Sequence, residues 1–108
     1  MRDPTAWSEA DLREQVFKLA NMYEWGIVYH RNSQGDTAWL PDLERKKSKG
    51  WPDLILVRPP RFLVVELKTD KGGVEKLQKV WLELLRQCPI EVYLWRPENL
   101  QEIANLLR

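Results

Sequence analysis

Residues 50–68, which read GWPDLILVRPPRFLVVELK, decide the fold of this chain. The stretch contains two apolar runs, 53–57 and 62–68, separated by Arg-Pro-Pro-Arg. Proline cannot donate a hydrogen bond to a β-ladder, so the chain is expected to turn between the runs. Each run is nearly continuous rather than alternating, which is typical of strands covered on both faces. The stretch therefore predicts an antiparallel hairpin inside a sheet that has helices on both sides.

Helices and further strands are predicted on either side of this hairpin. Ser8 is a favourable helix N-cap, and Asp11 completes a capping-box arrangement with it. The order of elements is helix, three strands, helix, strand, helix. This order predicts an α/β fold with a mixed central sheet flanked by helices. The length is that of a single domain over residues 1–108. The expected elements are a helix from Ser8, a strand at 27–30, a long polar loop at 31–50, strands at 53–57 and 62–68, a helix at 74–87, a strand at 91–95 and a last helix from Pro97.

The helix at 74–87 is expected to bury one apolar stripe against the sheet. Cys88 is the only cysteine, so it cannot form an intramolecular disulfide, and we expect it to be a small buried hydrophobe at the end of this stripe. The stripe consists of Leu77, Trp81, Leu84, Leu85 and Cys88.

The composition excludes several classes of protein. With 108 residues, 44% hydrophobic and 31% charged, the chain resembles an ordinary globular domain. The net charge of +1 gives no overall basic bias. No apolar run is long enough for a membrane span, and the N-terminus lacks a signal-peptide pattern, so a cytoplasmic location is expected. One cysteine and one histidine cannot form a zinc site, and no nucleotide-binding motif is present.

Two carboxylates and a lysine stand at one end of the predicted hairpin. Side chains alternate along a strand, so Glu66 and Lys68 share one face while Leu67 points into the core. Asp53 opens the neighbouring strand, which would bring its carboxylate close to that of Glu66. Each fragment alone is usually structural, because Pro-Asp is common turn chemistry and Glu-x-Lys is commonly a solvated ion pair. Their placement at one edge of the same sheet favours a functional site.

This pattern suits hydrolysis of phosphodiester bonds. Mg²⁺ prefers oxygen ligands and usually keeps several waters. Asp53, Glu66 and the backbone carbonyl of Leu67 are therefore predicted to hold a divalent ion, which can stabilise charge on a phosphoryl group and activate water. Lys68 is placed to orient the water or to stabilise the anionic transition state.

The same residues resemble a known family. Gly50-Trp51-Pro52-Asp53-Leu54, then Glu66-Leu67-Lys68, then Gln78-Lys79-Val80-Trp81-Leu82 look like the motifs of the VRR-NUC group of PD-(D/E)XK nucleases. Those nucleases include small stand-alone bacterial and phage proteins, and the resemblance extends from about Ser8 to Trp95. It implies a restriction-endonuclease-like fold, with Asp53 and Glu66 binding Mg²⁺ or Mn²⁺.

The resemblance also implies roles for further residues. Lys68 would be the catalytic lysine, and Gln78 would project from the second long helix toward the site. The family places another acidic residue near the metal from the first helix. Glu9 flanks the inward face of that helix, whereas Glu14 lies nearly opposite this face, so Glu9 is predicted to be the additional metal-binding and catalytic acid. The alternative is that Glu9 only complements the helix dipole.

Residues before the hairpin are predicted to contact DNA. A basic cluster next to Asp53 is placed to hold the phosphate backbone, although a solvated charged loop is the alternative. Trp39 and Trp51 would stack on unpaired bases or anchor the core. The predicted DNA-contacting residues are His30, Arg45, Lys46, Lys47 and Lys49.

The expected function is metal-dependent cleavage of DNA. No sequence-reading module is recognisable, so recognition by DNA shape is expected. The resemblance implies a homodimer that resolves four-way (Holliday) junctions, in the bacterial cytoplasm or in a phage-infected host cell. Cleavage of flaps or other branched DNA is the second possibility. A non-catalytic DNA-binding module and an interaction domain with incidental charges are the rival classes.

Overall fold

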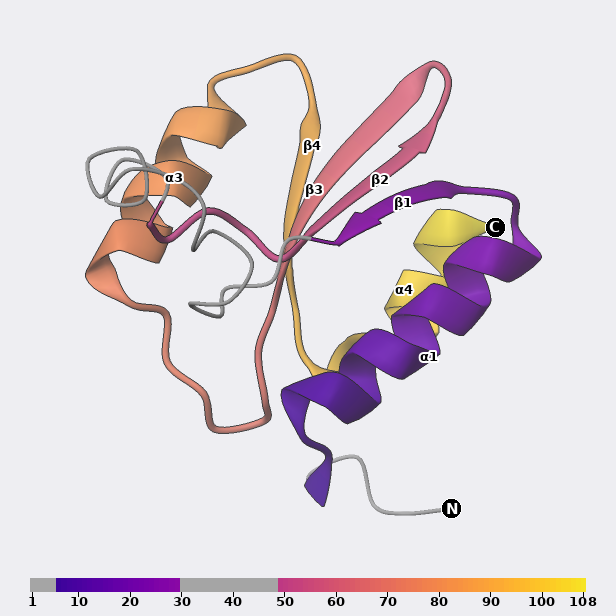
Figure 1. Ribbon diagram of the computed structural model, residues 1–108, viewed down its shortest axis with the longest axis horizontal. Coiled ribbons are helices and arrows are strands. Elements are labelled where there is room, and N and C mark those ends of the chain that lie inside the picture. Colours follow the sequence, from indigo (N-terminus) through magenta and orange to yellow (C-terminus); the bar gives the residue numbers. More distant parts are fainter. Residues whose placement is uncertain (1–5, 30–48) are drawn as a thin grey trace, which may run out of the picture.

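The computed structural model describes residues 6–29 and 49–108, and within them a mixed four-stranded sheet lies between helices. The sheet order is β1-β2-β3-β4, with β1, β2 and β3 antiparallel and β4 parallel to β3. Helices α1 and α4 cover one face and α3 packs on the other (Figure 1). The predicted class and order of elements are confirmed. The elements are α1 (Glu9–Met22), β1 (Gly26–Tyr29), β2 (Leu54–Arg58), β3 (Arg61–Leu67), α3 (Lys76–Arg86), β4 (Glu91–Trp95), the 3-10 helix η2 (Pro97–Asn99) and α4 (Leu100–Leu107).

The observed boundaries differ from the predicted ones by one or two residues. Both strands of the hairpin extend to a two-residue turn at Pro59-Pro60, because Arg58 pairs with Arg61. The last helix begins with a 3-10 turn at Pro97 before α4 starts. The N-cap of α1 is Ser8, and the reciprocal hydrogen bonds with Asp11 are both present, as predicted. Residues 30–48, which include most of the predicted loop, lie outside the described residues.

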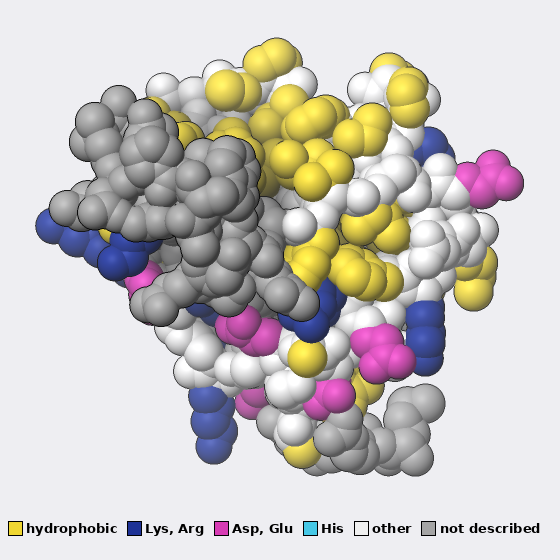
Figure 2. Space-filling model, in the orientation of Figure 1, with side chains coloured by type: hydrophobic (Ala, Val, Ile, Leu, Met, Phe, Trp, Pro, Cys, Tyr) yellow, Lys and Arg dark blue, Asp and Glu magenta, His cyan; other side chains and the backbone are white. Residues whose placement is uncertain are grey.

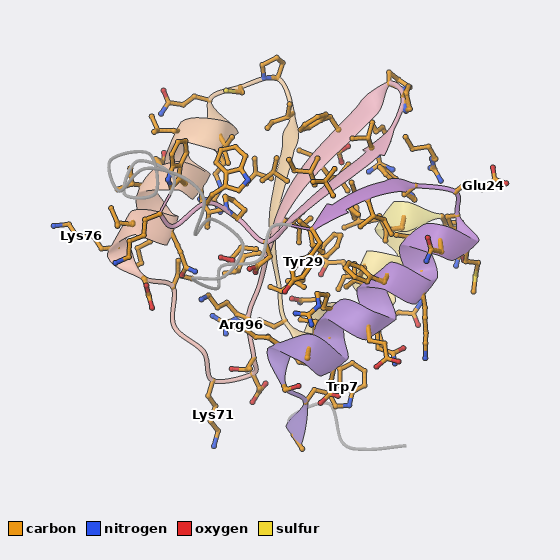
Figure 3. All side chains as sticks on the ribbon, in the orientation of Figure 1. Trp7, Glu24, Tyr29, Lys71, Lys76 and Arg96 are labelled. Atoms are coloured by element: carbon orange, nitrogen blue, oxygen red, sulfur yellow. The ribbon has the colours of Figure 1, made fainter. Side chains whose placement is uncertain are left out.

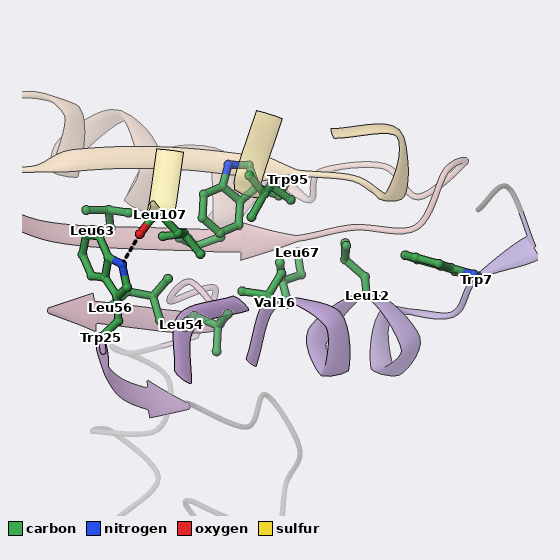
Figure 4. Packing of buried hydrophobic residues seen from close by; sticks show 13 residues of the cluster. Trp7, Leu12, Val16, Trp25, Leu54, Leu56, Leu63, Leu67, Trp95 and Leu107 are labelled. Atoms are coloured by element: carbon green, nitrogen blue, oxygen red, sulfur yellow. Dashed lines mark hydrogen bonds between the residues drawn. The ribbon is translucent and has the colours of Figure 1, made fainter. Parts of the chain in front are cut away.

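The hydrophobic core lies between the sheet and the pair α1 and α4 (Figure 4). Val16 from α1, Leu54 from β2 and Leu107 from α4 are all fully buried in it. The indole N–H of Trp25 donates to the Leu107 carbonyl at 2.8 Å, so this tryptophan joins the start of β1 to the end of α4.

Two arginines at the tip of the hairpin secure the C-terminal helix. Arg58 stacks on the Trp25 ring at 4.5 Å and donates to the carbonyls of Tyr23 and Leu107, both at 3.0 Å. Arg61 makes a bidentate pair with Glu91, with both N–O distances 2.8 Å. This hydrogen bonding by Arg61 is the main cause that holds the pKa of Glu91 below its ordinary value. These arginines satisfy carbonyls at the end of α4 that lack partners within the helix.

The buried face of α3 differs from the predicted one. Gln78 and Leu82 are buried, whereas Leu77 and Leu84, members of the predicted stripe, are exposed. Cys88 is exposed because it follows the end of the helix, so its predicted burial is wrong. Trp81 and Leu85, the other helix members of the predicted stripe, are half-buried, and Gln78 on the buried face donates to the buried Glu66 carboxylate.

No helix within residues 6–29 and 49–108 combines the length and the apolar character that a membrane crossing requires.

Candidate active site

The carboxylates of Asp53 and Glu66 lie side by side at one end of the sheet. Leu54 pairs with Val65 in the β2–β3 ladder, so the same register places Asp53 opposite Glu66. Residues directly opposite each other in an antiparallel pair point to the same face. That face is the one covered by α3, since Leu54 and Val65 point into the core on the other side. The register of the β2–β3 pair therefore brings the two carboxylates together, as predicted.

One oxygen of each carboxylate is held by the protein. Asp53 Oδ2 accepts the backbone N–H of Leu67 at 2.8 Å, which continues the ladder beyond the last paired residue. Glu66 Oε1 accepts the amide N–H of Gln78 at 2.9 Å. The Gln78 amide is itself oriented, because its Oε1 accepts the Glu75 backbone N–H at 2.9 Å. Each carboxylate is thus fixed through one of its two oxygens.

The second oxygen of Glu66 is buried and lacks a donor. Glu66 is only 1% exposed, and within the described part of the chain its Oε2 has no hydrogen-bond partner. Burial raises the pKa of Glu66 to about 9, followed by the neighbouring Asp53 carboxyl, with which only a protonated Glu66 can share a hydrogen bond, and by the charge of Asp53, although Lys68 opposes the shift. An ionised pair in this position is costly unless a proton or a cation lies between the two groups.

Lys68 is buried on the same face as Glu66 and two residues further along the chain. It forms no ion pair with any described carboxylate, but its charge acts on both Glu66 and Glu9. The turn that follows is held by Arg96, whose Nη1 donates to the carbonyls of Thr69 at 2.7 Å and Gly72 at 2.6 Å. Lys68 therefore stands beside the carboxylates in a segment that is fixed on both sides.

The segment that leads into Asp53 is docked on α3. Trp51 and Trp81 meet edge to face at 5.0 Å, and the Trp81 indole donates to the Lys49 carbonyl at 3.0 Å. Gly50 has a φ of +89°, and a Cβ there would lie 2.8 Å from the Leu77 backbone. Glycine is required at this position both by the backbone conformation and by the close approach. Trp51 thus contributes to packing, which is one of the two roles expected for it.

The first-helix acids differ clearly in their position. Partial burial and then the charge of Asp53 raise the pKa of Glu9, while Lys68 and Arg13 lower it. Glu9 is therefore within electrostatic range of the paired carboxylates. Glu14 is exposed and forms an ion pair with Lys18 at 3.7 Å. The structure brings Glu9, not Glu14, toward the site; its role as a metal ligand stays a prediction.

Only one of the predicted DNA-contacting residues can be placed. Lys49 is exposed beside α3, close in sequence to Asp53. The others lie outside the described residues, as does Trp39: these are His30, Arg45, Lys46 and Lys47. Lys71, on the segment that joins β3 to α3, and Lys76, at the start of α3, are exposed and point outward from the molecule (Figure 3).

Sequence reasoning did not single out Arg96, Arg13 or Tyr29, although each lies near this end of the sheet. Arg96 directly follows β4, and the pairing of Leu67 with Trp95 places it next to Lys68. A charged residue at the end of a buried parallel strand was a usable signal for Arg96. Arg13 and Tyr29 meet through tertiary packing, and the sequence contains no local sign of their contact.

The fold and the site define a class of protein. A mixed sheet flanked by three helices, with paired carboxylates and a lysine at one end, is consistent with a PD-(D/E)XK core. A scan against protein-family models matches the VRR-NUC domain over residues 4–98, and the chain belongs to that family. It is thus a DNA-processing module of nuclease type. Neither the curated proteins nor the solved structures give a match.

The residues present fit a hard divalent cation. No three His, Cys, Asp or Glu side chains gather into a metal-binding group within residues 6–29 and 49–108. Glu9 thus does not gather with Asp53 and Glu66 in these ranges, so two carboxylates would hold the ion and waters would complete the shell, as is usual for Mg²⁺. The buried Glu66 Oε2 without a donor is the observation that favours a cation here. Leu67 lies between Glu66 and Lys68, so its carbonyl remains the predicted third ligand.

Proposed function

We propose that this protein is a Mg²⁺- or Mn²⁺-dependent endonuclease that hydrolyses DNA phosphodiester bonds and recognises DNA structure rather than sequence. The single observation that supports metal dependence is buried Glu66, whose Oε2 lacks a donor, paired with half-buried Asp53. Membership of the VRR-NUC family supports the nuclease activity.

The chain's own residues have distinct roles in this proposal. Asp53 and Glu66 supply the anionic oxygens that would hold the cation, and Gln78 keeps Glu66 in place. A bound cation supplies Lewis-acid stabilisation of the charge on the phosphoryl group. Lys68 orients the attacking water or stabilises the transition-state charge. Glu9 adds negative charge on the side from which α1 approaches.

A four-way junction is the proposed substrate, and a homodimer the proposed form. The α3 side of the sheet is apolar beyond α3 itself: Val28 is 56% exposed, Phe62 is exposed, and both neighbour half-buried Ile55 and Val57 in the sheet. Yellow side chains gather on the face seen in Figure 2. A two-fold contact between copies through this uncharged face would repeat the catalytic centre symmetrically, as symmetric junction cleavage requires.

Dimerisation has its own test, which leaves the catalytic groups intact. Phe62→Lys is expected to convert a dimer to a monomer in sedimentation velocity experiments, whereas Met22→Lys, at an exposed site on α1, is the matched control. A wild-type protein that sediments as a monomer at micromolar concentration would exclude the dimer.

Cleavage of defined DNA tests the activity itself. Synthetic four-way junction, flap and duplex are incubated with the protein in Mg²⁺ or in EDTA. We expect junction cleavage that requires the metal and is lost in Lys68→Ala. Preferential cleavage of flaps would favour the second substrate class. Binding without cleavage would favour a non-catalytic DNA-binding module, and neither activity would favour an interaction domain.

A further inference from the structure

We propose that Arg13 and Tyr29 form a phosphate-binding subsite for DNA beside the carboxylate pair, an inference that rests on the proposed nuclease function. Tyr29 is the last residue of β1 and pairs with Leu54, the residue after Asp53. Arg13 lies one helical turn after Glu9 on α1. Tyr29 lies between α1 and the part of the sheet where β2 begins (Figure 3). Tyr29 points, like its partner Leu54, to the α1 side of the sheet. The two residues therefore lie at the same end of the sheet as the carboxylate pair but on the opposite face, the one from which Glu9 approaches.

The guanidinium of Arg13 is held in a defined orientation. Its Nη1 donates to the Tyr29 hydroxyl at 2.9 Å, and its central carbon lies 4.6 Å from the centre of the Tyr29 ring. The ring itself is fixed by an edge-to-face contact with Phe17, at 6.0 Å between centroids. Phe17 in turn packs on the hydrophobic core. An arginine that is oriented before binding loses less side-chain entropy when a ligand arrives.

Most of the hydrogen-bonding capacity of Arg13 is unused. A guanidinium has five N–H donors, and among the described residues Arg13 donates only to Tyr29. No described carboxylate forms an ion pair with it. Arg58, Arg61 and Arg96 differ in this respect, because they donate to backbone carbonyls or to Glu91. The charge of Arg13 acts on nearby Glu9, but within residues 6–29 and 49–108 its remaining N–H donors have no acceptor and can serve a ligand.

A phosphodiester is the ligand that this geometry favours. The planar fork of a guanidinium matches two phosphate oxygens, and such charge-assisted hydrogen bonds are short and strong. β1 and β2 are neighbouring strands, about 4.8 Å apart, and Tyr29 and Asp53 stand at the same end of them with side chains on opposite faces, so a bound DNA strand would reach Arg13 around the end of the sheet. A DNA strand whose scissile phosphate lies at Asp53 and Glu66 would place a neighbouring phosphate within reach of Arg13. The pair would then fix the position of the strand without reading bases.

The test pairs substitutions in the protein with neutral linkages in the DNA. Junction DNA is prepared with single methylphosphonate linkages, which lack the phosphate charge, at positions flanking the cleavage site. Binding is measured in EDTA, where no cleavage occurs, for the wild type, Arg13→Gln, Tyr29→Phe and Lys18→Gln. Lys18 is the control because it is an exposed cation on the same helix.

We expect Arg13→Gln to weaken binding about tenfold or more and to reduce the salt dependence by about one phosphate contact. One methylphosphonate should weaken binding of the wild type but leave binding of Arg13→Gln unchanged, which a purely structural role would not produce. Tyr29→Phe should have a smaller effect, and Lys18→Gln none. Arg13→Gln that binds like the wild type, with equal sensitivity to every methylphosphonate, overturns the subsite.

The outcomes separate this inference from the proposed function. If the wild type cleaves junctions and Arg13→Gln binds normally, only the subsite fails. If the wild type binds but does not cleave in Mg²⁺, and Arg13→Gln loses the methylphosphonate effect, the nuclease proposal fails while the subsite is supported. A wild type that neither binds nor cleaves overturns both. Circular dichroism of Arg13→Gln confirms that a loss of binding does not result from unfolding.

Discussion

Replacing Glu66 with glutamine should make the metal-free protein more stable at neutral pH. The side chain of glutamine has the same shape as that of glutamate, and its Oε1 can still accept from Gln78. Its Nε2 can donate toward Asp53, which supplies the donor that an ionised Glu66 lacks. The substitution therefore removes the need to take up a proton on folding at neutral pH and preserves the local hydrogen bonds.

The magnitude follows from the pKa of Glu66. In the folded protein this pKa is raised from 4.5 to about 9. Between these values the unfolded chain has released its proton and the folded chain has kept it, so the free energy of unfolding falls as the pH rises. Each pH unit in this interval costs on the order of 1 kcal/mol, which gives a loss of roughly 2 to 3 kcal/mol between pH 5 and pH 7. This loss is absent in Glu66→Gln.

Urea unfolding in EDTA at pH 5 and pH 7 measures the difference. We expect the wild type to lose stability relative to Glu66→Gln across this interval, while groups common to both proteins cancel. Glu14→Gln, an exposed change elsewhere on the surface, should follow the wild type. Addition of Mg²⁺ at pH 7 should restore stability in the wild type far more than in Glu66→Gln. If the free energies of unfolding of the wild type and Glu66→Gln change in parallel between the two pH values, Glu66 does not have a pKa raised by burial.

Three further substitutions test other parts of the structure. Glu9→Gln should lower the cleavage rate about tenfold or more, because Glu9 acts electrostatically on the site, and Glu14→Gln should leave the rate unchanged. A larger loss of rate in Glu14→Gln than in Glu9→Gln would assign the role of the first-helix acid to Glu14. Gly50→Ala should reduce kcat by about a hundredfold, because the added Cβ would displace the segment that positions Asp53. A near-normal rate in single-turnover assays would show that the position of Asp53 does not depend on Gly50. Arg58→Ala should lower the free energy of unfolding, measured in urea, by about 2 kcal/mol, because it removes hydrogen bonds and the stacking on Trp25. A loss below about 0.5 kcal/mol, which is the effect of an ordinary surface substitution, would show that the hairpin tip does not hold α4 in place.

The arrangement of the carboxylates could be predicted because it depends on local rules. The prolines at 59 and 60 mark the turn, and a short turn fixes the register of the two strands that it joins. The register then places Asp53 opposite Glu66. The alternation of side chains places Lys68 on the same face as Glu66. Each step follows from residues that are near one another in the sequence.

The orientation of α3 could not be predicted in this way. The apolar pattern alone placed the stripe of Leu77 and Leu84 against the sheet, whereas only the family resemblance placed Gln78 toward the site, and the buried face includes Gln78. A glutamine is buried there because it satisfies one oxygen of Glu66, and this hydrogen bond depends on tertiary structure. The contact between Arg13 and Tyr29 was missed for the same reason, since it joins a helix to a strand that is distant in the sequence.

Binding of Mn²⁺ to the protein, followed by electron paramagnetic resonance at pH 7, measures most directly whether the two acids hold a cation together. We predict saturable binding by the wild type, with affinity at least about tenfold lower in both Asp53→Asn and Glu66→Gln. Equal Mn²⁺ affinity in the wild type and both variants would contradict the account.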